Sequence, residues 1–308
     1  MRKFYLRNEG GTVERQYQLQ YTDAFLWQPG GLGFSYDRSY AESDGFYLKL
    51  NEVLSQTPKT GTIVFLGSNP YADYKAFVDW VTASQKLKLA YSTDDVTYYF
   101  MDVDVENLEK SEIQLDGTLQ CSITMLPTSP IYLIDSTKVE INGELPSNMK
   151  RYDYTYALDP DAVAPYTEKD YWYTYSDTAV AGTITITPQA QLPCCFEIYT
   201  NKAVSQPVLT FTDEHGNIFG RVDLSAISFT PQDAPNDYLL YSNIPTSAGV
   251  TQRVSGTVSD ITNYLGISPQ YPSFFTLPAK RTTSVTLSAD SLVGVEIEIR
   301  VYRYFVSV

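Results

Sequence analysis

Few residues in this sequence combine the type and the spacing that catalysis requires. The one histidine, His215, lies in the segment TDEHGN beside Asp213 and Glu214. A histidine base needs a nucleophile and an orienting group within reach. The same segment, however, is typical of a hairpin turn between two apolar runs. We therefore interpret His215 as a turn residue and predict no catalytic residues.

Three carboxylates share one face of a predicted strand in the segment YYFMDVDVENL. Asp102, Asp104 and Glu106 alternate with apolar residues and recur at steps of roughly 6.5–7 Å along the strand. Such a face is either solvated, or lines an anionic channel, or holds a cation. We predict no metal site here and keep the other two readings open.

The three cysteines are Cys121, Cys194 and Cys195. An odd number with one adjacent pair is not a disulfide framework, and no CxxC or CxxH spacing indicates zinc. We predict small buried side chains, and no cofactor.

Aromatic residues cluster in the segment YWYTY, which contains Tyr171, Trp172, Tyr173 and Tyr175. Exposed rings of this kind either anchor a protein interface or stack on sugar faces, whereas alternate rings on a strand can equally line a core. The sequence leaves a core, a docking surface and a sugar platform open.

Composition excludes several classes of protein. The chain of 308 residues has a formal net charge of −14, and acidic residues are spread over its whole length. Such a chain should not bind nucleic acid phosphates, because that needs clustered cations. We expect no signal peptide and no membrane span, since no stretch approaches the ~20 apolar residues that a span needs.

One helix is expected in a chain that is otherwise mainly β. Asn69 is a plausible N-cap, Pro70 suits the first helical position, and the helix should cover about residues 70–85. An apolar stripe at helical spacing should pack against a core; it consists of Tyr74, Phe77, Val78 and Val81. Short strands between turns recur beyond a proline-rich junction at about 127–150, a pattern typical of a β-sandwich.

Several strings in this order resemble the distal tail protein family (the Dit-type baseplate hub) of siphophages. They are PGGLGF at 29–34, GTIVF at 61–65, the helix and strand at 71–91, and the segment 98–132. The resemblance implies a ring-forming, tail-tube-like β-sandwich with one helix at residues 1–130. It also implies a galectin-like β-sandwich at 131–308.

The resemblance further implies a structural hub of the virion, located at the phage tail tip, and no enzyme. Six copies would close into a homo-hexameric ring that joins the tail tube protein to the tail-associated lysin or tip protein. Receptor-binding or baseplate proteins would surround the ring, and DNA would pass without specific binding. The acidic face of Asp102, Asp104 and Glu106 is one candidate lining of the lumen. The alternative function is a carbohydrate-binding module for host cell-wall sugars in the C-terminal domain.

Overall fold

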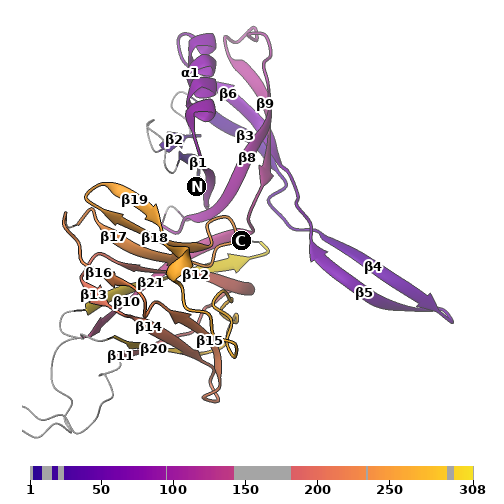
Figure 1. Ribbon diagram of the computed structural model, residues 1–308. Coiled ribbons are helices and arrows are strands. Elements are labelled where there is room, and N and C mark those ends of the chain that lie inside the picture. Colours follow the sequence, from indigo (N-terminus) through magenta and orange to yellow (C-terminus); the bar gives the residue numbers. More distant parts are fainter. Residues whose placement is uncertain are drawn as a thin grey trace, which may run out of the picture. The chain divides into compact units, whose positions relative to one another are not determined.

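The computed structural model describes residues 3–8, 16–19, 24–94, 96–141, 182–233, 235–289 and 295–307 (Figure 1). Strands dominate these residues and one α-helix stands among them, so the prediction of a mainly β fold with one helix is confirmed.

The chain divides into two compact units. Unit 1 contains Met1–Ile134, Gln189–Cys194 and Tyr302–Val308, and unit 2 contains Asp135–Pro188 and Cys195–Val301. Two segments distant in sequence thus return to unit 1. As a statement about independently folding domains, the predicted division into 1–130 and 131–308 stays a prediction.

Unit 1 is built on an antiparallel sheet with the strand order β3–β6–β9–β8–β7–β1–β2. In chain order these strands are β1 (Lys3–Asn8), β2 (Gln16–Gln18), β3 (Ala24–Gly30), β6 (Lys59–Phe65), β7 (Leu87–Ser92), β8 (Tyr99–Glu109) and β9 (Leu119–Pro127). Strand β9 illustrates how the alternation of apolar and polar residues places one face of the sheet in the core. Its residues Leu119, Cys121, Ile123 and Met125 are buried, while the residues between them are more exposed.

The helix α1 spans Pro70–Ala83, close to the predicted range. The Asn69 side chain accepts a hydrogen bond from the Ala72 N–H at 3.3 Å, and Pro70 occupies the first turn. Ser84 adopts an extended backbone conformation and ends the helix. Local capping and proline therefore fix where this helix starts.

Most of the remaining strands form two sheets and one short pair. The strand order β19–β18–β17–β12–β21–β10 forms one sheet, and β11–β20–β14–β15 forms the other. Their bounds are β10 (Ile131–Ile141), β11 (Gly182–Ile186), β12 (Leu192–Thr200), β14 (Val208–Thr212), β15 (Ile218–Asp223), β17 (Tyr238–Ser242), β18 (Gly249–Val254), β19 (Thr257–Asp260), β20 (Thr283–Ser288) and β21 (Val295–Phe305). The short strands β13 (Val204–Ser205) and β16 (Ser228–Phe229) pair with each other, and a 3-10 turn covers Thr262–Tyr264. Strand β10 lies within the segment 127–150 that the sequence indicated as a junction.

The core of unit 2 lies between these two sheets. Phe196 of β12 faces Phe211 of β14 with ring centroids 5.0 Å apart, and Tyr241 of β17 lies 5.7 Å from Phe196. All three side chains are fully buried. Two sheets that bury aromatic rings between facing surfaces form a sandwich, as the strand pattern predicted.

Candidate functional site

The lone histidine lies in a tight turn. His215 sits between β14 and β15, where its backbone N–H donates to the Asp213 carboxylate at 2.9 Å. Asp213 also accepts from the Asn217 N–H at 2.8 Å, and this hydrogen bond is the main cause that lowers the Asp213 pKa. These contacts belong to a hairpin turn, so the interpretation of His215 as a turn residue is confirmed.

Metal chemistry also finds no support in the described part of the chain. Among these residues, no group of three His, Cys, Asp or Glu side chains could hold a metal ion. Cys121, Cys194 and Cys195 are all buried, and burial raises the pKa of the Cys121 thiol.

The acidic face of β8 is not uniform. One carboxylate oxygen of Asp102 accepts a hydrogen bond from the Tyr132 hydroxyl at 2.8 Å, whereas Asp104 and Glu106 are exposed. The pairing of β8 with β9 shifts register between Val105 and Asn107, so Glu106 lies at an irregularity of the strand. The lumen assignment stays a prediction, and Asp104 and Glu106 are its more accessible members.

The helix stripe lies on the core of unit 1. Phe77 is fully buried, and its ring centroid lies 4.8 Å from Tyr17 and 6.0 Å from Phe65. Trp80, which the predicted stripe omitted, is buried beside it. Tyr74 and Val81 are half-buried against this core, and Val78 is half-buried. The aromatic segment with Tyr171, Trp172, Tyr173 and Tyr175 lies outside the described residues.

A hairpin that sequence reasoning missed exposes several large apolar side chains. Within the part of the chain that the structure describes, strands β4 (Tyr36–Ser43) and β5 (Phe46–Leu54) pair only with each other, and we call this hairpin the arm (Figure 1). The residues Asp44 and Gly45 join the strands with φ of 51° and 81°. Two positive φ values in a two-residue loop indicate a type I′ turn, for which Asp-Gly is a preferred sequence. That dipeptide was the available sequence signal.

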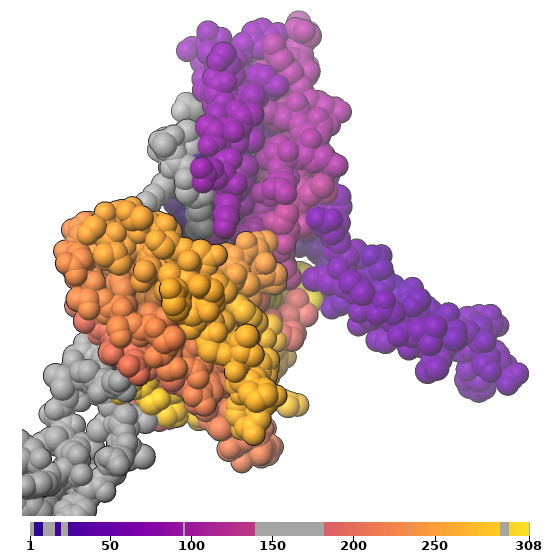
Figure 2. Space-filling view, viewed as in Figure 1, coloured from indigo at the N-terminus to yellow at the C-terminus, as the bar shows by residue number. Residues whose placement is uncertain are grey.

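The arm exposes apolar side chains along β5. Phe46 is 79% exposed, Tyr47 71% and Leu48 67%. Phe46 and Leu48 alternate with Tyr47, so both faces of the hairpin carry exposed apolar groups; Figure 2 draws the atoms of the arm. A two-stranded hairpin without a partner is marginally stable in water. An exposed apolar surface of this kind marks a site of interaction.

Polar contacts fix the base of the arm in unit 1. The backbone N–H of Ser55 donates to the carbonyl of Ser35 at 2.9 Å, and the hydroxyls of Ser35 and Thr57 lie 3.0 Å apart. The Gln56 side chain donates to the carbonyl of Pro127 at 2.8 Å. Backbone and side-chain hydrogen bonds within unit 1 therefore hold the root of the arm.

A pocket of about 340 Å³ lies at this root. Its apolar wall includes Phe34, Leu54, Met101, Ile131 and Phe305. Lys59, the first residue of β6, also lines the pocket, although only 5% of its surface is exposed. We call this cavity the Lys59 pocket.

The Lys59 ammonium is poorly compensated. Its hydrogen bond runs to the carbonyl of Gly31, and no carboxylate within the described ranges forms an ion pair with it. Burial lowers the pKa of Lys59. An ammonium has three donors, and burying its charge without a counter-ion is costly. The pocket is therefore suited to a group that brings a carboxylate.

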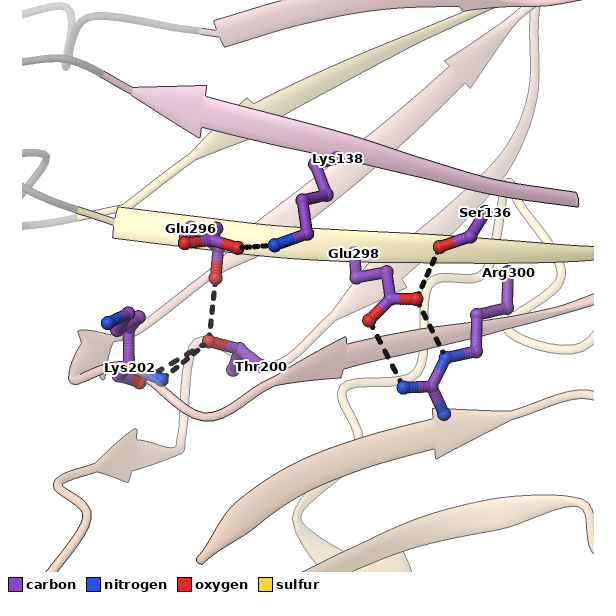
Figure 3. A network of polar contacts seen from close by, with 7 residues as sticks. All are labelled: Ser136, Lys138, Thr200, Lys202, Glu296, Glu298 and Arg300. Carbon is purple, nitrogen blue, oxygen red and sulfur yellow. Dashed lines mark hydrogen bonds and ion pairs between the residues drawn. The ribbon is translucent and has the colours of Figure 1, made fainter. Parts of the chain in front are cut away.

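Unit 2 carries a polar network on the strands β10, β21 and β12 (Figure 3). Glu298 accepts two hydrogen bonds from Arg300 at 3.1 Å each and another from Ser136, and the Arg300 bonds are the main cause that lowers its pKa. Lys138 pairs with Glu296 across the same strands. The Arg300 guanidinium lies 4.3 Å from the centroid of the Tyr199 ring. This network joins strands and covers a ring, as cross-strand pairs do.

The comparisons with known proteins agree with the family resemblance that the sequence showed. Residues 3–128 match the family model described as the distal tail protein, N-terminal domain. No curated protein sequence matches the chain. No helix in the described ranges has the length and apolar character of a membrane span.

Two solved structures share the fold over nearly the whole chain. The structure of the phage P2 baseplate in its activated conformation with Ca contains a chain of 16% identity and TM-score 0.66, with all of both chains covered. The SPP1 Dit protein, described as a hub of the adsorption apparatus in phages that infect Gram-positive hosts, has 10% identity and TM-score 0.53, with 97% of this chain and 98% of that chain covered. The resemblance seen in the sequence is confirmed over residues 3–128, which match the N-terminal domain of distal tail proteins, and the chain shares its fold with these two phage proteins.

Proposed function

We propose that this protein is the hub of a phage tail tip and that six copies close into a ring. The ring joins the tail tube protein to the tail-associated lysin or tip protein and to receptor-binding or baseplate proteins, and DNA passes through it. The single observation that carries the proposal is the arm, which pairs with no other strand of the described residues and exposes Phe46, Tyr47 and Leu48.

The arm supports assembly because burial of its apolar side chains in a neighbouring copy would stabilise both. Each fully buried side chain of this size contributes roughly 1.5–3 kcal/mol. A contact between two different surfaces of the same chain is heterologous, and such contacts give rings when the rotation closes. The number six follows from the family resemblance.

The charge of the chain supports passage of DNA without binding. With a net charge of −14, the protein repels phosphates at long range. We assign the lumen to the face of β8 that carries Asp104 and Glu106, both exposed. A cationic lining would hold DNA in a salt-dependent manner.

The test is the mass and shape of the purified full-length protein. Light scattering should give a mass six times the 34.7 kDa of one chain, and negative-stain images should show rings. A protein that stays monomeric at high concentration and in varied salt would refute the proposal. Replacement of Phe46 and Leu48 by Ser should release monomers, whereas replacement of the exposed Leu115, outside the arm, should leave the rings intact.

A carbohydrate-binding role for the second unit remains the alternative, and no described contact favours it. The ring of Tyr199 has the Arg300 guanidinium over one face at 4.3 Å, so that face cannot stack on a sugar. Calorimetry of the full-length protein with host cell-wall polysaccharide would decide the matter. Saturable binding with a measurable heat would support the alternative.

A further inference from the structure

We propose that the tip of one arm docks in the Lys59 pocket of the next copy, where the Asp44 carboxylate pairs with the Lys59 ammonium. The inference rests on the proposed ring and names the contact that closes it. Each copy would donate one arm tip and receive another.

The pocket supplies an apolar wall and an uncompensated cation. Phe34, Leu54 and Met101 line it together with Lys59, whose ammonium donates a hydrogen bond to the Gly31 carbonyl and forms no ion pair among the described residues. Its volume of about 340 Å³ is many times the ~10–15 Å³ that a single water molecule requires. This space is enough for the side chains of a tight turn.

The tip supplies the complementary groups. Asp44 is exposed in the two-residue turn, and Phe46 follows it with 79% of its surface exposed. Both cations of the arm, Arg38 and Lys49, pair with Glu52 at 2.7 and 3.0 Å. No ion pair compensates Asp44 among the described residues, so the tip combines an apolar ring with an uncompensated carboxylate.

The geometry of the arm requires a second copy as the donor. Strand β4 has 8 residues, which span roughly 26 Å at about 3.3 Å per residue. The pocket lies at the root of the arm, where Leu54, Ser55 and Gln56 line it. A paired hairpin cannot bring its own tip back to its root, so only the tip of another copy can enter.

A double-mutant cycle tests the pairing in the full-length protein. Lys59→Met removes the ammonium at similar length, and Asp44→Asn removes the carboxylate while keeping Asn-Gly, another preferred type I′ sequence. Each single variant should raise the concentration of half-assembly roughly 30-fold or more, as truncation of one partner in a buried charge pair does. The double variant should lose little beyond either single one.

Lys75→Met and Asp79→Asn serve as matched controls. These residues form an ion pair on α1 with side chains 76% and 62% exposed, so their loss should leave assembly unchanged. Thermal unfolding of each variant separates assembly from folding. Lys59→Met should leave the melting temperature of the monomer unchanged or raised, since it removes a buried charge.

A cross-link gives a second readout. Cysteines introduced at Ser43 in the tip and Thr128 in the pocket wall should form disulfides between copies and a ladder on a non-reducing gel. A chain with cysteines at Ser43 and at Thr82, which is exposed on α1, should give no ladder. This inference would be overturned if rings assemble, the effects of Lys59→Met and Asp44→Asn on half-assembly are additive, and no disulfide ladder forms. The proposed function would then still stand. Absence of rings in the unmodified protein would overturn both.

Discussion

Replacement of Phe77 by Ala should destabilise unit 1 by about 3–5 kcal/mol. The side chain is fully buried on α1, with Tyr17 at 4.8 Å and Phe65 at 6.0 Å between ring centroids. Removal of the ring creates a cavity and breaks two aromatic pairs, each worth about 0.5–1.5 kcal/mol beyond the buried area. We therefore expect a value in the upper half of this range.

Chemical denaturation followed by tryptophan fluorescence measures the effect, because Trp80 lies 5.6 Å from Tyr17 in the same core. Val78→Ala is the matched control, since Val78 is half-buried on the same helix. Its expected loss is below about 1 kcal/mol, because Ala also favours the helix. A loss below about 1 kcal/mol for Phe77→Ala as well would refute the packing of α1 on the core.

Three further outcomes are expected. Gly31→Ala should destabilise the protein, because Gly31 has a φ of +73° and an added Cβ would lie 2.1 Å from the carbonyl oxygen of Pro58. The control Gly33→Ala should be tolerated, since its added Cβ meets no atom within 4 Å. Thermal unfolding of the two variants measures the difference in stability. Asn69→Ala should cost about 1 kcal/mol through loss of the N-cap, measured by the same method, and a Ser in its place should restore most of it. Backbone hydrogen bonds from Thr97 and Val96 lower the pKa of Asp94 to about 2, so its stabilising effect is present above its ordinary pKa of 3.8 and is lost as the pH falls through 2. NMR titration of the Asp94 carboxyl should give this low pKa, and an ordinary value would contradict the turn geometry.

Local sequence signals predicted the elements whose ends are fixed by local chemistry. Asn69 and Pro70 marked the start of α1, and the alternation in β9 marked its buried face. The stripe omitted Trp80 because helical spacing alone does not say how wide a face the core covers. The register shift near Glu106 likewise depends on the partner strand β9.

The proposed assembly site was not visible in the sequence. The apolar residues of β5 are typical of any buried strand, and only the absence of a covering partner in the described fold makes them an exposed arm. In the sequence, Lys59 is indistinguishable from an exposed polar residue at the start of a strand. It becomes a buried cation because the segments around Phe34 and Pro127, far apart in sequence, meet at the root of the arm.

The sequence by itself determined the mainly β class, the single helix and the resemblance of its first part to the distal tail protein family, because these depend on local periodicity, capping and ordered strings along the chain. The tertiary structure alone decided which apolar and charged groups lack partners, because burial and pairing are set by residues distant in sequence. Phe46 and Lys59 are therefore ordinary residues in the sequence and become candidate contact residues only in the fold.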